Sequence, residues 1–243
     1  MIPKKVVLEP VAHVYHHVET GERYPSVTTF LGRFEKHFDA DGVAAAIVRQ
    51  REDRKNPKYA GKTKADILQM WQDENDAANE FGTMVHGVIE KYLVARTFYF
   101  PKDETEIKIL EGWKKLNVDL GQEYYPEQVL YHEGFKLAGM SDLVIDIDDE
   151  LFDIADWKTN KKFNYFSEYK QKMLYPVEHL EDCQHSVYSL QLSIYAYFYE
   201  CLTSKKCRQL YVGYFNREDY SFSRIPLLYL KESVIKMLET IKD

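Results

Sequence analysis

The chain has 243 residues, of which 45% are hydrophobic and 29% charged, a composition typical of a folded globular protein. Its 32 basic and 39 acidic residues give a net charge of −7, which excludes a protein coated in positive charge, such as a histone-like DNA-packaging protein. No stretch approaches the ~20 apolar residues of a membrane span. The three cysteines indicate free thiols in a reducing compartment, and the first ten residues resemble neither a signal nor a transit peptide. We therefore expect a cytoplasmic protein.

The first eighty residues predict a β-hairpin followed by a helical arm. Residues 4–24 alternate apolar runs with a turn sequence at residues 19–22, which is typical of a hairpin. Ser26 suits the N-cap of a helical turn, and a helix is expected over residues 39–54. The segment over residues 49–64 is strongly basic. It is either a solvated helix end and loop or a mobile arm that follows a phosphate backbone.

The rest of the chain changes from helical spacing to strand-like runs and back. Apolar residues recurring at intervals of three and four predict helices over residues 65–73, 75–95, 105–116, 186–202 and 231–241. Runs rich in β-branched and aromatic residues predict strands over residues 127–131, 137–147, 151–158, 209–215 and 220–227. This order predicts a mixed α/β (α+β) fold, in which helices flank a central mixed sheet within one domain.

The hairpin predicted over residues 137–158 carries the strongest chemical signal. With its turn at residues 148–150, Asp142 falls directly opposite Asp156, and side-chain alternation puts Lys158 on the same face. Two facing carboxylates destabilise a sheet unless a cation lies between them, and oxygen ligands favour Mg²⁺ or Mn²⁺. The alternative is an exposed hairpin with solvated charges, although the apolar neighbours of Asp156 indicate a buried strand. The acidic turn over residues 146–149 lacks the pattern of a calcium loop and is expected to be solvated.

Two of the predicted helices carry polar pairs that are weaker signals. His86 and Glu90 lie four residues apart on one helix face, where they form either a surface hydrogen bond or part of a site. Glycines beside His86, including Gly87, weaken the helix and indicate that something packs closely there. Gln191 and Tyr195 share one face of an otherwise apolar helix, as core residues or as part of a site.

In order and spacing, these residues resemble the PD-(D/E)XK nuclease superfamily, and specifically its RecB-like branch. A G-x-x-x-H-x-x-x-E helix, a G-x-x-D strand, a D-x-K-T strand and a Q-x-x-x-Y helix correspond here to Gly82, His86, Glu90, Gly139, Asp142, Asp156, Lys158, Thr159, Gln191 and Tyr195. The matched region covers about half of the chain, and Ser141 stands where the branch usually has proline. Residues 24–29 are similar to the start of the mitochondrial-genome-maintenance exonucleases and their phage relatives.

The resemblance implies a single domain, with a restriction-endonuclease-like nuclease core over residues 81–243 and the hairpin and arm over residues 1–80. It implies that one or two Mg²⁺ or Mn²⁺ ions are held by His86, Asp142, Asp156 and the backbone carbonyl of Trp157. Asp142, Asp156 and Lys158 would be the catalytic residues, with support from Glu90, Glu127, Gln191 and Tyr195. The iron–sulfur members of the branch use four cysteines that bracket the core. No cysteine precedes Cys183 here, so we expect no cluster.

By this resemblance the protein is a metal-dependent deoxyribonuclease of a bacterial or phage-infected cell, acting in DNA repair or recombination beside replication or recombination proteins. A basic arm beside such a core favours an exonuclease that acts on single-stranded DNA or free ends. The expected DNA contacts are Arg54, Lys55, Lys58, Lys62, Lys161 and Lys162. The alternatives are an endonuclease, a non-catalytic DNA-binding module with the same fold, and a different metal hydrolase. The last would use His179, Cys183 and His185, whose spacing is not that of a zinc site.

Overall fold

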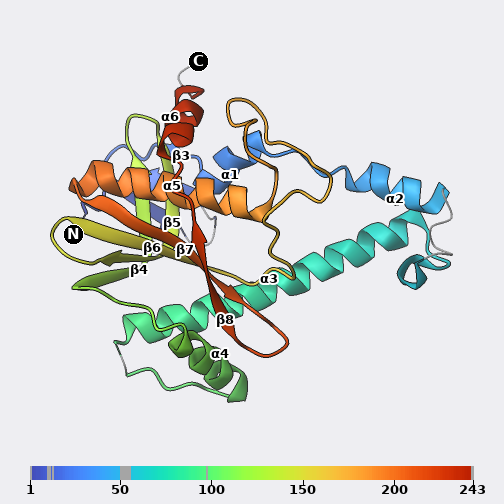
Figure 1. The fold of residues 1–243 in the computed structure, drawn as a ribbon, viewed down its shortest axis with the longest axis horizontal. Coiled ribbons are helices and arrows are strands. Elements are labelled where there is room, and N and C mark those ends of the chain that lie inside the picture. Colours follow the sequence, from blue (N-terminus) through green and yellow to red (C-terminus); the bar gives the residue numbers. More distant parts are fainter. Residues whose placement is uncertain (1, 10–11, 13, 50–55, 97, 242–243) are drawn as a thin grey trace. The chain divides into compact units, whose positions relative to one another are not determined.

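The structure, a computed structural model, describes residues 2–9, 12, 14–49, 56–96 and 98–241 (Figure 1). The chain divides into two units, which we call the core unit (Met1–Lys36 and Val85–Asp243) and the arm unit (His37–Met84). Among the helices of the described residues, none is both long and apolar enough to cross a membrane. The organisation of the whole chain as one nuclease domain remains a prediction.

The core unit begins with a small antiparallel sheet, as the hairpin pattern predicts. Its three strands, in spatial order, are β1 (Val6–Glu9), β2 (Val14–His17) and β3 (Arg23–Tyr24). Ser26 then caps the short helix α1 (Val27–Leu31), because its Oγ accepts a hydrogen bond from Thr29 N at 2.9 Å. The 3₁₀ turn η1 (Gly32–Phe34) follows directly. The predicted N-cap is confirmed.

A five-stranded mixed sheet forms the centre of the core unit, which confirms the predicted fold class. In spatial order its strands are β4 (Glu123–His132), β5 (Leu137–Asp146), β6 (Leu151–Lys158), β7 (Lys206–Phe215) and β8 (Phe222–Leu227). Neighbours are antiparallel except β6 and β7. Those two strands are parallel because the helix α5 (Gln184–Thr203) lies between them in the chain and crosses over the sheet. The first strand starts four residues earlier than the sequence pattern predicts.

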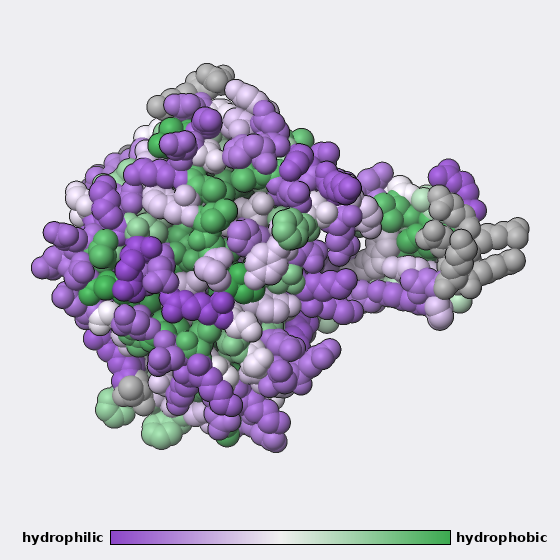
Figure 2. Space-filling view, in the orientation of Figure 1, coloured by the Kyte–Doolittle hydropathy of each residue, from purple (hydrophilic) through white to green (hydrophobic). Residues whose placement is uncertain are grey.

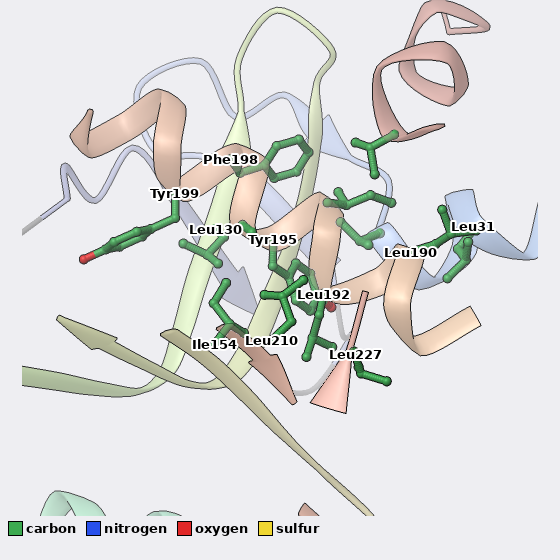
Figure 3. Close-up of a cluster of buried hydrophobic side chains, with 14 of the residues drawn as sticks. Leu31, Leu130, Ile154, Leu190, Leu192, Tyr195, Phe198, Tyr199, Leu210 and Leu227 are labelled. Carbon is green, nitrogen blue, oxygen red and sulfur yellow. The ribbon is translucent and has the colours of Figure 1, made fainter. Parts of the chain in front are cut away.

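The main core lies between α5 and the sheet, with the C-terminal helix α6 (Lys231–Glu239) also packed against α5 (Figure 3). Leu190, Leu192 and Phe198 of α5 are fully buried against Ile154 of β6 and Leu130 of β4. Each such side chain stabilises the fold by about 1.5–3 kcal/mol relative to an exposed one. The site described below therefore rests on a rigid sheet and helix.

The side chain of Trp157 belongs to a second layer, formed with the helix α4 (Glu104–Lys115). Its ring meets that of Trp113 edge-on, with the ring centroids 6.1 Å apart. Gly213 of the neighbouring strand leaves room for it, since an added Cβ would lie 2.5 Å from the Trp157 ring. This packing fixes the backbone of β6 at the point where the sequence predicts a site.

The arm unit contains the helix α2 (Ala40–Arg49), the short turn η3 (Pro57–Tyr59) and most of the helix α3 (Lys64–Val94). The rest of the helix predicted over residues 39–54 lies outside the described residues. α3 is one continuous helix of 31 residues, so the predicted break near residue 74 is wrong. The polar run there interrupts the apolar stripe because residues 72–77 are exposed. It contains no glycine or proline to end a helix.

Candidate active site

The β5–β6 hairpin has the register expected from its sequence. Leu143 pairs with Ala155, and continuing that register by one step puts Asp142 opposite Asp156. The two strands are joined tightly at this step, because Trp157 N donates a hydrogen bond of 2.6 Å to Asp142 Oδ2. The predicted register is therefore confirmed as far as Leu143 and Ala155, and its continuation brings the two carboxylates face to face.

Lys158 forms an ion pair with the buried carboxylate of Asp156, with Nζ and Oδ2 2.5 Å apart. Burial and the neighbouring Asp142 raise the pKa of Asp156 to about 6. Burial lowers the pKa of Lys158, but the two carboxylates outweigh it and raise that pKa above its ordinary value. Lys158 is therefore a fixed cation beside both acids. Its Nζ also lies 4.9 Å from the centre of the Tyr188 ring.

His86 reaches the same acids from α3. Its Nδ1 lies 3.2 Å from Asp142 Oδ1, and its side chain is 30% exposed. Burial opposes the charged imidazole, but Asp142 overcomes this and raises the pKa of His86 to about 9. Burial likewise raises the pKa of Asp142, yet His86 and Lys158 lower it below its ordinary value. In the protein without a metal, this is an imidazolium–carboxylate pair at neutral pH.

Glu127 occupies an unusual position on β4. Pro126 pairs with Leu143 and Gln128 with Ser141, so Glu127 lies opposite Asp142 but outside the paired ladder. Its φ of +49° is in the left-handed region, which a non-glycine residue adopts at a cost of about 1–3 kcal/mol. Burial, followed by the charges of Asp142 and Glu90, raises the pKa of Glu127 to about 8. The strained backbone conformation thus places the carboxyl group of Glu127 close to the acidic side chains of Asp142 and Glu90.

His86, Glu127 and Asp142 could together hold a metal ion. One ligand atom from each lies within 4.8 Å of the other two, and no other group of three His, Cys, Asp or Glu residues in the described chain meets this criterion. An imidazole with two carboxyl groups suits a divalent cation. The raised pKa of Glu127 fits this reading, because a cation relieves the crowding of acids. Asp156 and the Trp157 carbonyl lie outside this group, and their role as ligands remains a prediction.

The α5 pair lies in the same place as the hairpin acids. Gln191 Nε2 donates a 3.2 Å hydrogen bond to Tyr195 Oη, and both side chains are buried. Burial raises the pKa of Tyr195, so its hydroxyl stays protonated. A pocket of about 150 Å³ is lined by Asp142, Asp156, Lys158, Gln191 and Tyr195, together with Tyr15, Ser26, Val27, Thr28, Gly139 and Met140. Three of the four sequence motifs thus open onto one pocket, whose wall includes the start of α1.

Gly139 of the β5 motif and Gly87, next to His86 in α3, are expected to respond oppositely to alanine. A Cβ at Gly139 would lie 2.6 Å from Tyr195 Cε1 and 3.0 Å from Val27 Cγ2, so Gly139→Ala should destabilise the protein by about 1–3 kcal/mol. At Gly87 a Cβ meets nothing within 4 Å, and the expectation of a close neighbour there is wrong. Gly87→Ala should stabilise the helix by up to ~1 kcal/mol. Urea denaturation of both variants measures this, and two shifts of the same sign would contradict it.

The remaining predicted residues are more dispersed. Glu90 acts on Glu127 through its charge, while Lys161 and Lys162 are exposed at the start of the loop after β6. Lys58 and Lys62 are exposed in the arm unit, where Lys58 Nζ lies 2.8 Å from a Glu74 oxygen. Arg54 and Lys55 lie outside the described residues. Tyr188 is not among the predicted site residues, although its spacing of three and seven residues from Gln191 and Tyr195 places all three on one helix face.

No protein-family model and no curated protein matches the chain. Among solved structures, it is similar to a protein of Eubacterium rectale named "putative exonuclease", with 12% identity and a TM-score of 0.35, covering 86% of this chain and 67% of the other. A second structure, named SSO0001, has 12% identity and a TM-score of 0.35, covering 88% of this chain and 81% of the other. Similarity at this level is too low to identify a function, which must therefore be inferred from the geometry of the site.

Proposed function

We propose that the protein is a metal-dependent deoxyribonuclease, and that it acts as an exonuclease on single-stranded DNA or on free DNA ends. The observation that carries this is the convergence of Asp142, Asp156 and Lys158 on one pocket, with His86 and Glu127 beside Asp142. Buried acids crowded around a fixed cation are costly to a fold. A reaction at a phosphodiester, with its own negative charge, explains their presence better than stability does.

Mg²⁺ or Mn²⁺ is the cofactor that the donor set favours, because most of the donors are carboxylates. His86, Glu127 and Asp142 would hold the first ion, and Asp156 with the Trp157 carbonyl would complete one or two sites. When bound, the metal would polarise the phosphodiester and lower the pKa of a water molecule.

The protein's own side chains would stabilise the transition state and position the water and the DNA strand. Lys158, held by Asp156, stays cationic at neutral pH and would stabilise the extra negative charge on the phosphate in the transition state. It would also orient the attacking water. Gln191 and Tyr195 brace each other across the pocket wall and would position the strand.

Digestion of end-labelled single-stranded, duplex and circular DNA in Mg²⁺, Mn²⁺ or EDTA tests the proposal. An exonuclease should release mononucleotides or short products from linear DNA, leave circular DNA intact and stop in EDTA. Cleavage of circular DNA would identify an endonuclease instead. Binding of DNA without cleavage under any metal condition would identify a non-catalytic module.

The basic segment of the arm is expected to contribute to DNA binding through its attraction to phosphates. Reversing the charges of Lys55, Lys58 and Lys62 to glutamate should weaken binding to single-stranded DNA and flatten its salt dependence, with the slope of log affinity falling by about 0.7 for each phosphate no longer neutralised. The matched control reverses three lysines elsewhere, at Lys4, Lys108 and Lys236. Fluorescence anisotropy between 50 and 200 mM salt, roughly the range over which such interactions are screened, measures both variants. Unchanged affinity at every salt concentration would mean that the segment is an ordinary solvated loop.

A further inference from the structure

The loop between β6 and α5 exposes an unusual number of large side chains. Of the sixteen large hydrophobic side chains that are exposed in the described chain, five lie in residues 165–175. Phe166, Tyr169 and Tyr175 are 75%, 80% and 77% exposed. Figure 2 shows hydrophilic side chains over most of the visible surface of the core unit, with hydrophobic ones gathered toward its middle. Each large aromatic ring left in water lacks the roughly 1.5–3 kcal/mol of stabilisation that its burial would give. A group of such rings on one loop indicates a binding surface.

This exposure does not result from a poorly anchored segment. Met173 and Val177 are buried in the main core, and Leu174 N donates a 2.8 Å hydrogen bond to Phe34 O. Asp182 N bonds to Gln171 O at 3.0 Å, which ties the two sides of the loop together. The loop is therefore pinned to the core at its middle while its aromatic rings point outward.

The first part of this loop, residues 160–175, is basic within an acidic protein, whereas residues 176–183 carry three acids, Glu178, Glu181 and Asp182. Residues 160–175 contain four lysines, Lys161, Lys162, Lys170 and Lys172, but only one acidic residue, Glu168. Two of these lysines are partly offset by long ion pairs, of 3.8 Å from Lys162 to Glu168 and 3.6 Å from Lys172 to Glu181. Because the whole chain carries −7, this local excess of positive charge points to an anionic ligand.

The loop also begins next to the candidate active site. Lys158 contacts the Tyr188 ring at 4.9 Å, and that ring lies 5.9 Å from the ring of Phe163. Phe163 in turn meets Tyr165 edge-on at 5.1 Å. On its other side the loop bonds to Phe34, in the turn that continues α1, whose first residues line the pocket. A ligand on this loop would thus extend from the pocket.

We propose that residues 160–175 bind single-stranded DNA outside the pocket, with Phe166, Tyr169 and Tyr175 stacking on bases and the lysines contacting phosphates. This inference rests on the proposed function and specifies the substrate. Exposed rings interleaved with lysines suit unpaired bases, since stacking needs a free base face and accepts any sequence. In a duplex the base faces are covered, so the loop selects single strands or frayed ends.

Binding measured in EDTA tests the loop separately from catalysis. Tyr169→Ala and Phe166→Ala should each weaken binding of a fluorescent oligothymidylate by roughly 5- to 150-fold, the range expected when one base loses its stacking partner. Binding of an abasic strand of the same length should not change, and Tyr169→Trp should keep the wild-type affinity. Phe100→Ala is the matched control, because Phe100 is 83% exposed outside this loop. Its affinity should equal that of the wild type.

Cleavage of thymidine 5′-p-nitrophenyl phosphate, which is too small to reach the loop, separates this inference from the proposed function. The loop variants should cleave it at the wild-type rate. If the wild type cleaves neither this ester nor DNA, the proposed nuclease function is overturned. The role of the loop is still decided by oligothymidylate binding measured in EDTA. Unchanged oligothymidylate binding by Tyr169→Ala and Phe166→Ala would overturn the stacking role. So would an equal loss for the abasic strand, or tighter wild-type binding to blunt duplex than to single strands.

Discussion

Asp156→Asn is expected to remove metal-dependent cleavage almost completely, by on the order of 10³-fold or more, while the protein stays folded. The substitution keeps the shape of the side chain but removes the charge that holds Lys158 in place. Loss of a single preorganised electrostatic group in an active site costs about 10²–10³ in rate, and Asp156 is also an expected metal ligand. Since burial raises the pKa of Asp156 to about 6, its ionised form is not favoured by the fold, and the amide should be tolerated.

Rates on end-labelled single-stranded DNA in Mn²⁺, with melting temperatures measured in parallel, test this expectation. Asp149→Asn is the matched control, because Asp149 is an exposed acid at the turn of the same hairpin. Lys158→Ala should be equally inactive, but less stable, since it leaves the buried Asp156 without its cation. Cleavage at the wild-type rate by either Asp156→Asn or Lys158→Ala would contradict the assignment of these residues to the active site.

The hairpin at the centre of the site could be predicted because its geometry is local. A short turn between two antiparallel strands fixes every later pair, so the facing of Asp142 and Asp156 follows from the turn alone. The N-cap at Ser26 is predictable for the same reason, because it depends on only three following residues. Motifs of this kind carry their own spacing, and tertiary packing only has to leave them undisturbed.

Contacts between distant segments are not contained in such local rules. Asp146 belongs to the acidic turn that was expected to be solvated, yet it is buried by Tyr199 and Lys205, more than fifty residues away. The approach of His86 to Asp142 joins residues 56 positions apart and follows only from the family resemblance. The left-handed backbone of Glu127 has no signal at all in its sequence neighbourhood. None of these features follows from the residues that are neighbours in the sequence.

The affinity of the site for Mn²⁺ is expected to rise steeply with pH. Without a metal, the pKa of His86 is about 9 and that of Glu127 about 8, so both groups carry a proton at pH 7. A protonated imidazole or carboxyl group is not a ligand, so binding must displace these protons, and each displaced proton makes affinity rise up to tenfold per pH unit. Displacement from His86 alone gives roughly 100-fold tighter binding at pH 8 than at pH 6. With Glu127 included, the gain is on the order of 10³–10⁴-fold.

Isothermal titration calorimetry in buffers of different ionisation enthalpy counts the released protons directly. Glu127→Gln should release one proton fewer and show a pH slope lower by about one unit, because its amide has no proton to lose. Glu150→Gln, at an exposed position in the hairpin turn, should behave like the wild type. A Mn²⁺ affinity that stays constant from pH 6 to pH 9 would mean that neither His86 nor Glu127 is a ligand. The metal would then have to lie between Asp142 and Asp156, whose lower pKa values leave both ionised above pH 7.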